Sequence, residues 1–226
     1  ASHNTAIGFS ALGSTTTGHS NTAVGRTAMW ANTTGNSNTC IGYGAGGENT
    51  TGSQNVAVGQ YAGDSVTTGD NNTSIGYDAG DTITTGSNNI SLGYNAEPTG
   101  ATASNEITLG NSSNDDLRCN DTTISSLSDA RDKVDVVNLP SGLSFVNTLR
   151  PVKFKWQTRD GNIKDGRIRA GFLAQELQIA QKDNEFLDLV SNKNPDRLEA
   201  KYGNLIPCLV QAIKELSTKV TALEAK

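Results

Sequence analysis

The sequence predicts an all-β repetitive rod of the β-helix or β-solenoid type, followed by an α+β domain that ends in a long coiled-coil helix. Three observations predict this: a fixed 17-residue period, a change of composition near residue 128, and heptad spacing at the C-terminus. Residues 1–127 hold 19 of the 24 glycines with 2 basic and 10 acidic residues, whereas residues 128–226 hold 5 glycines with 16 basic and 13 acidic residues. We therefore predict two domains, 1–127 and 128–226.

The first domain is defined by a pattern of Asn, Thr, a small residue, an aliphatic residue and Gly, which recurs every 17 residues. A second glycine series, preceded by Thr-Thr, and an alanine series keep the same step. Repeats that stay in phase in this way indicate stacked structural units, and their glycines indicate positive φ or close backbone approach. The closing glycines of the pattern are Gly8, Gly25, Gly42, Gly59, Gly76, Gly93 and Gly110.

The aliphatic position of each repeat is mostly β-branched, which is typical of strands, and turn residues separate these strands. A single short repeat cannot bury its aliphatic side chain alone, so we expect the stacked copies to form a continuous aliphatic ladder. With about 4.8 Å per strand, seven repeats make a rod roughly 34 Å long. The ladder consists of Ile7, Val24, Ile41, Val58, Ile75, Leu92 and Leu109.

The period leaves open whether the rod is one chain coiled on itself or three chains wound together. The small residues before the aliphatic position permit close approach of neighbouring backbones, which slightly favours three wound chains. The residues after each closing glycine are either a receptor-facing ladder or ordinary surface and flank-packing positions, with the second reading favoured. The small residues are Ala6, Ala23, Cys40, Ala57 and Ser74, and the residues after the glycines are Phe9, Arg26, Tyr43, Gln60, Tyr77 and Tyr94.

Composition narrows the classes of function. The net charge of −5 gives no reason to expect nucleic acid or an anionic membrane as a partner, and no apolar run suggests membrane insertion. Three cysteines, Cys40, Cys119 and Cys208, form neither a metal spacing nor a disulfide framework. His3 and His19 are too isolated for a metal site, so we expect no metal and no cofactor. Cys40 occupies a small-residue position and is expected to be buried.

The second domain reads as a compact α+β module. Residues 152–156 alternate apolar and basic, as a half-buried strand does, residues 160–162 carry a turn signal, and residues 167–172 begin a second strand. Residues 173–177 then change to helical spacing.

The C-terminal segment has apolar residues spaced 3, 4, 3, 4 and 3 apart, after Pro207 near the first helical turn. This pattern predicts a coiled-coil seam between copies, and an amphipathic helix packed on its own domain would usually carry a wider apolar stripe. The predicted seam consists of Ile206, Leu209, Ile213, Leu216, Val220 and Leu223.

A hexapeptide from Ser128 to Lys133 lies where the composition changes. A serine directly after a peptide carbonyl can attack it through a small ring, because proximity supplies much of the rate. Its hydroxyl needs a base, and an amine serves as one only where burial or neighbouring cations depress its pKa. The pair therefore suggests a chain that cuts itself at this point.

Four motifs resemble one known family in their order. They are Ser128-Asp129-X-Arg131-X-Lys133, residues 149–156 (LRPVKFKW), residues 171–176 (GFLAQE), and Tyr202 with Leu205-Ile206-Pro207 before the terminal heptads. Together they resemble the endosialidase-type C-terminal intramolecular chaperone, a self-cleaving peptidase family that ends bacteriophage tail fibres and tailspikes and also occurs in the myelin regulatory factor of animals.

The resemblance implies a homotrimeric module that brings three chains into register, allows the β-rod to fold and is then removed. It implies that Ser128 is the nucleophile, that Lys133 is its base and that the cut falls between Leu127 and Ser128. Asp129 and Arg131 match motif positions and are expected to support the loop. The implied partners are two further copies of the chain and a host cell-surface glycan or protein receptor.

The resulting expectation is a viral tail fibre, assembled in the host cytoplasm and located in the virion, whose peptidase acts once on its own chain. Two alternatives stay open at this point. In the first, the module remains uncleaved as a permanent trimer clamp. In the second, the chain is a bacterial trimeric adhesin head, whose repeats also carry small-aliphatic-Gly steps.

Overall fold

The computed structural model describes residues 1–114, 117–118, 128–155, 157, 166–196 and 198–226. The chain forms two compact units, Ala1–Asp116 and Leu117–Lys226, and each is described by itself. The predicted domain boundary between residues 127 and 128 adjoins residues outside the described ranges and stays a prediction.

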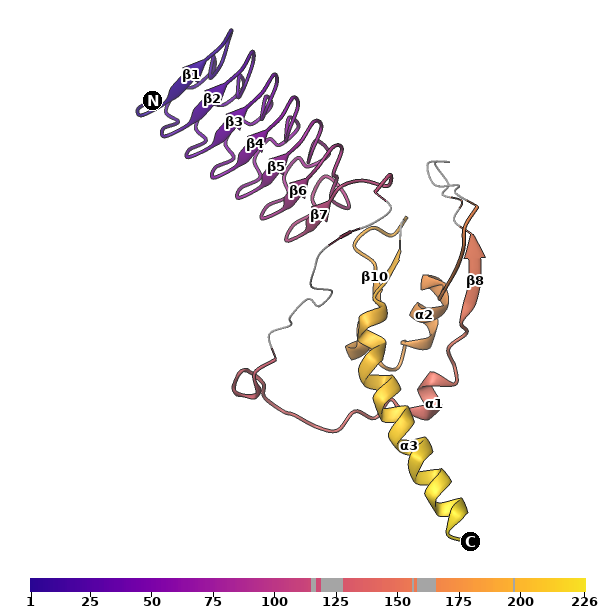
Figure 1. The fold of residues 1–226 in the computed structure, drawn as a ribbon. Coiled ribbons are helices and arrows are strands. Elements are labelled where there is room, and N and C mark those ends of the chain that lie inside the picture. The colour runs from indigo at the N-terminus through magenta and orange to yellow at the C-terminus, as the bar shows by residue number, and fades with distance from the viewer. Residues whose placement is uncertain (115–116, 119–127, 156, 158–165, 197) are drawn as a thin grey trace. The chain divides into compact units, whose positions relative to one another are not determined.

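The first unit is a β-solenoid, as predicted. Seven three-residue strands form one parallel sheet in chain order, and each strand lies directly beside the next (Figure 1). Every pairing joins residues 17 positions apart, for example Ile41 with Val58. The strands are β1 Thr5–Ile7, β2 Thr22–Val24, β3 Thr39–Ile41, β4 Val56–Val58, β5 Thr73–Ile75, β6 Ile90–Leu92 and β7 Ile107–Leu109.

These pairings answer the question that the period left open. Each strand finds its neighbour in the next coil of the same chain, so the rod is one chain coiled on itself. The slight preference for three wound chains was wrong. The small residues that suggested it, such as Ala23 and Ala57, permit close approach across the interior of a single narrow coil, where both are buried.

The aliphatic ladder exists, but it lies on the outside of the solenoid and not in its core. Because side chains alternate along a strand, the central residue of each strand points inward and the two flanking residues point outward. Ala23, Cys40 and Ala57 are buried, whereas the outward-facing Ile41 is 41% exposed. Stacking the repeats therefore builds the ladder but does not bury it, since small side chains fill the space directly behind each strand.

A column of buried asparagines runs along the interior and carries a regular hydrogen-bond network. In each case the side-chain oxygen accepts from the backbone N–H of the residue 17 positions on, which is the next asparagine except at Asn89, where it is Glu106. The side-chain nitrogen donates to a backbone carbonyl 14 residues on. Such pairing satisfies backbone groups that the short strands leave free. The buried members are Asn21, Asn38, Asn55, Asn72 and Asn89.

The periodic glycines are required by backbone crowding. Gly59 has φ +134°, and a Cβ there would overlap the backbone carbonyl of Gly76 in the next coil. Gly52, from the second series, would likewise place a Cβ against the carbonyl oxygen of Gly69 without any positive φ. The first series thus needs glycine for conformation and for space, and the second for space alone.

The second unit is an α+β module. β8 (Val152–Lys155) pairs antiparallel with β9 (Ile168–Gly171), and the short β10 (Val190–Ser191) pairs with β11 (Glu199–Ala200). The predicted strands and the helix after residue 173 lie where expected, whereas the predicted turn at 160–162 falls outside the described residues. The helices are η1 Ala130–Asp132, α1 Leu143–Val146, α2 Ala174–Ala180, η2 Glu185–Leu187, η3 Tyr202–Leu205 and α3 Ile206–Glu224.

The core of this module lies between α1, α2, η2, η3 and the start of α3. Its buried members are Phe145, Leu177, Leu187, Leu189, Val190, Leu205 and Cys208. The first turns of α3 are therefore anchored to the module, and Pro207 stands in the first turn as the sequence predicted.

Candidate functional site

Ser128 and Lys133 are brought together by a single 3₁₀ turn, η1. Asp129 caps this turn by accepting a hydrogen bond from the backbone N–H of Arg131, and the Arg131 guanidinium forms an ion pair with the same carboxylate. That ion pair lowers the pKa of Asp129. The turn places Lys133 Nζ 2.6 Å from Ser128 Oγ, close enough for a hydrogen bond.

This geometry joins the hydroxyl of Ser128 to the amine of Lys133. Asp129 and Arg131 lie on the turn between the two, so they support the loop, and neither contacts the Ser128 hydroxyl through a described hydrogen bond. Both Ser128 and Lys133 are exposed to solvent in the single chain. Leu127, on the other side of the predicted cut, lies outside the described residues.

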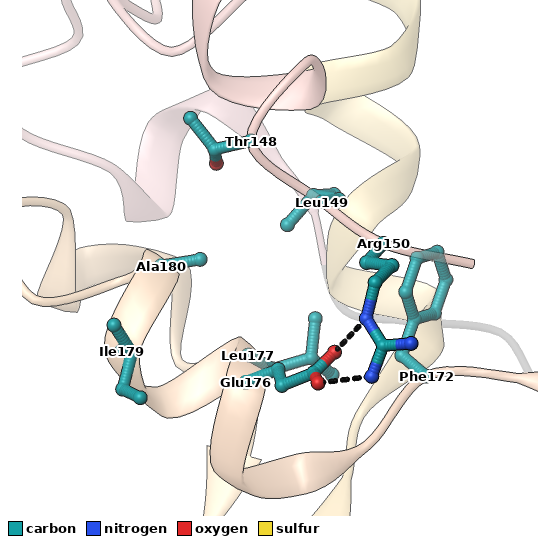
Figure 2. A pocket seen from close by; sticks show the side chains of 8 residues that line it. All are labelled: Thr148, Leu149, Arg150, Phe172, Glu176, Leu177, Ile179 and Ala180. Carbon is teal, nitrogen blue, oxygen red and sulfur yellow. Dashed lines mark hydrogen bonds and ion pairs between the residues drawn. The ribbon is translucent and has the colours of Figure 1, made fainter. Parts of the chain in front are cut away.

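Two further motifs, 149–156 and 171–176, are linked by one ion pair. Arg150 precedes β8, Glu176 lies in the first turn of α2, and the guanidinium makes a two-pronged contact with the carboxylate, with Nε donating to Oε2 at 3.1 Å (Figure 2). The pair raises the pKa of Arg150 and lowers the pKa of Glu176. Bidentate Arg–carboxylate contacts fix orientation as well as charge.

The fourth motif joins the same assembly through Tyr202. Its hydroxyl accepts from the backbone N–H of Phe172 at 3.0 Å and donates to the carbonyl of that residue at 3.2 Å. The two rings make an edge-to-face contact, and a Cβ at Gly171 would collide with the tyrosine hydroxyl. The glycine, the aromatic pair and the tyrosine therefore act together to hold β9 against the start of the C-terminal helix.

A pocket of about 340 Å³ opens beside the Arg150–Glu176 pair. Figure 2 shows that apolar side chains from α2 and from the segment before β8 form most of its wall. It is lined by Thr148, Leu149, Arg150, Phe172, Glu176, Leu177, Ile179 and Ala180. Sequence reasoning did not predict this pocket, although its walls coincide with two of the four motifs.

The predicted seam of α3 has no covering in the single chain. The helix turns a different face, with Cys208 and Ala212 buried, toward its own module. Ile213 is 66% exposed and Leu223 is 68% exposed. The helix therefore packs on its own module through Cys208 and Ala212, as the competing interpretation expected, but not through the predicted seam, whose pairing between copies stays a prediction.

The cysteines and histidines are the remaining candidate sites. Cys40 is buried, as expected, and burial raises the pKa of its thiol to about 12, while burial also raises the pKa of the Cys208 thiol. Cys119 lies outside the described residues. Within the described ranges no group of His, Cys, Asp and Glu side chains is arranged to hold a metal ion. None of the helices among those residues is both long and apolar enough to cross a membrane.

The comparison with known families covers the first three of the four motifs, while Tyr202 and residues 205–207 lie beyond the matched segment. Residues 128–184 match the peptidase family described as chaperone of endosialidase, and the match covers about a quarter of the chain. The C-terminal region is thus of the endosialidase-chaperone type. The match begins at Ser128 and includes Lys133, Arg150 and Glu176. No curated protein and no solved structure matches the chain.

Proposed function

We propose that the chain is the distal part of a phage tail fibre or spike, whose C-terminal module drives homotrimerisation and folding of the solenoid rod and is then released by cleavage between Leu127 and Ser128. The observation that carries the proposal is the 2.6 Å contact between Ser128 Oγ and Lys133 Nζ, at the first residue of the matched chaperone segment. The fibre belongs to the virion and is assembled in the host cytoplasm, and its exposed surface meets a host receptor.

Trimerisation is supported by the uncovered seam of α3. Six apolar side chains at heptad spacing face solvent, from Ile206 to Leu223. Burying them between three copies removes apolar surface from water at about 25 cal/mol per Å². A clamp at one end raises the effective concentration of the other chains, so that the three rods meet at matching levels.

Cleavage requires that the Lys133 amine lose its proton and accept one from the Ser128 hydroxyl. The hydroxyl oxygen then attacks the carbonyl carbon of residue 127, the peptide bond breaks, and the nitrogen of Ser128 takes up a proton as the new amino terminus. Water finally hydrolyses the ester formed on the serine. In the single chain the lysine is exposed, so we infer that assembly supplies the desolvation that a lysine base needs. Cleavage would then report completed assembly.

The exposure of Ser128 and Lys133 also favours a second candidate, in which the module stays attached as a permanent clamp. Denaturing electrophoresis and intact mass of the purified chain distinguish the two. Autoproteolysis predicts two fragments for the natural chain and one species for Ser128→Ala. Ser144→Ala, at another exposed serine of the module, serves as the matched control and should still be cleaved.

Lys133→Arg separates chemistry from folding. Arginine keeps the positive charge but is not deprotonated in proteins, so this variant should stay whole while sedimenting as a trimer. A single species in the natural chain would overturn cleavage and favour the clamp. A monomer at micromolar concentration would overturn both candidates.

A further inference from the structure

The outward face of the solenoid sheet, here called the rod strip, consists of the first and third residue of each strand β1 to β7. We propose that the rods of the three copies pack on one another along this strip, parallel and in register. The inference rests on the proposed homotrimer and adds the surface by which the rods themselves meet.

An aliphatic side chain occupies every level of the rod strip, and most of these side chains are exposed, whereas Val24 and Val58 are half-buried. Ile7 is 60% exposed, Ile75 is 42% exposed and Leu109 is 53% exposed. Because each strand pairs with the next at the same register, these side chains form one straight column along the sheet. Single exposed aliphatics are ordinary on a protein surface, whereas a contiguous column marks an interaction surface.

The rod strip also carries no charge. The outward positions hold only Thr, Val, Ile and Leu, in a unit whose acidic residues outnumber its basic ones. The second column of the strip becomes more apolar toward the last coils, where Ile90 and Ile107 replace the threonines of the first coils. The acidic residues, such as Asp64 and Asp70, lie outside the strands. A charge-free face can be buried on a threefold axis without the cost of desolvating or opposing carboxylates.

Aromatic side chains border the strip after four of the closing glycines, at Phe9, Tyr43, Tyr77 and Tyr94. Tyr77 and Tyr94 stack with their ring centroids 5.7 Å apart, and the Arg26 guanidinium lies 5.5 Å from the ring centre of Tyr43. Phe9 is exposed at the first coil. Large aromatic residues and arginine are enriched at protein interfaces, so this border extends the apolar surface sideways.

The occupant that fits the strip is another copy of the same chain. A parallel copy places the aliphatic residue of every coil against the same residue at the same level, and only a solenoid of equal step keeps that match along the whole length. The strip measures about 29 Å by 10 Å, from roughly 4.8 Å per strand and 3.3 Å per residue. Such an area lies far below the roughly 800 Å² per partner of a stand-alone interface. The rods therefore associate only when the C-terminal module already holds the chains together.

Disulfide trapping tests the inference on the full chain in a Ser128→Ala, Cys119→Ser background. Ile75→Cys at the centre of the strip should form an interchain disulfide under mild oxidation. The matched control is Thr68→Cys, an exposed position at a corner of the coil outside the sheet. Around a threefold axis two of three cysteines can pair, so the linked fraction should level off near two thirds. Linking should be at least about tenfold faster at residue 75 than at residue 68 because the effective concentration is higher.

Charge insertion gives a second measurement that does not depend on disulfide geometry. Ile41→Asp combined with Ile75→Asp should make the rod cleavable by protease at least about tenfold faster, since the carboxylates would face one another on the axis. Thr51→Asp combined with Thr68→Asp is the control pair at exposed corners. If the chain sediments as a trimer, but disulfide linking and protease cleavage proceed as in the control variants, the rod-strip contact is refuted and the proposed function stands. A monomer by sedimentation refutes both. Faster binding of lipid vesicles or of a glycan to the natural strip than to the charged variant, without trapping, assigns the strip to a receptor and overturns the inference.

Discussion

The asparagine column makes a sharp prediction about what holds the coils together. Asn55 is buried, its Nδ2 donates to the carbonyl of Gly69 at 2.8 Å, and its Oδ1 accepts from the backbone N–H of Asn72 at 2.8 Å. Asn55→Ala removes both partners at once. The backbone groups left behind are enclosed by the coil, where water does not replace the lost hydrogen bonds.

The magnitude follows from the two stranded backbone groups. Leaving one buried donor or acceptor unpaired costs about 1–3 kcal/mol, so the substitution should cost about 2–6 kcal/mol. The effect should be local, because each coil of a solenoid contacts only its neighbours. The coils on either side of Asn55, residues 38–72, should therefore open before the ends of the rod.

Hydrogen exchange resolved by peptide measures this, since it reports the free energy of local opening. Thr68→Ala is the control, because Thr68 is exposed and its side chain makes no described hydrogen bond, and it should change stability by less than about 0.5 kcal/mol. If residues 38–72 exchange their amide hydrogens as slowly in Asn55→Ala as in this control, the asparagine column contributes nothing to stability and the strands alone hold the coils together.

Three further predictions concern the helix, the glycines and one carboxylate. Ile213→Asp should raise the chain concentration needed for trimers by at least about a hundredfold, because three unpaired carboxylates would be buried. Thr218→Asp on the outer face of the helix should leave that concentration unchanged. Sedimentation measures the trimer fraction of both variants. Gly59→Ala should lower the yield of folded rod in circular dichroism, since its Cβ would overlap the carbonyl of Gly76 at φ +134°, and an unchanged melting temperature would contradict this. Burial and nearby carboxylates raise the pKa of Asp64 to about 6, whereas its pKa in the unfolded chain is roughly 3.9. Between these two pH values the folded rod binds more protons than the unfolded chain. The rod therefore loses stability as the pH rises from about 4 to about 6. Asp64→Asn should abolish that slope and, after allowance for solvent screening, gain about 1 kcal/mol at pH 7 in thermal unfolding.

The period of the rod was predictable because the same residue types recur at the same positions of every repeat. Which residues face the inside of the coil and which face the outside could not be predicted, since both faces of a three-residue strand carry apolar or small residues. The usual rule that larger aliphatics point inward fails for Ile41 and Ile75, because the position directly behind each strand is filled by a small residue such as Ala57, while the large buried side chains, such as Met29 and Ile83, come from the corners of the coil. The asparagine at the same phase of each repeat was the available signal, since a polar residue kept in phase with small buried ones indicates a satisfied interior column.

The Ser128–Lys133 pair was predicted from its place at the change of composition and from the resemblance that the downstream motifs carry, because a Ser and a Lys five residues apart are common by chance. The Arg150–Glu176 pair and the contact of Tyr202 with Phe172 were not, since they join residues 26 and 30 positions apart through the fold of the module. The backbone conformation at the corners of the coil could not be predicted either. Thr27 and Tyr61 adopt positive φ without being glycine, which local sequence preference argues against and the stacked coils impose.

The two exposed apolar surfaces have one physical consequence when considered together. The seam of α3 has the heptad spacing of a coiled coil and six exposed apolar side chains, whereas the rod strip is too small to hold copies together unaided. Association should therefore be ordered, with the helices pairing first and the rods following once the chains are tethered. After cleavage the tether no longer holds the rods, and the apolar contact along the strip is too small to bring separated chains back together. Released rods should then fail to reassemble after denaturation. Recovery of trimers from the denatured 1–127 fragment would contradict this order.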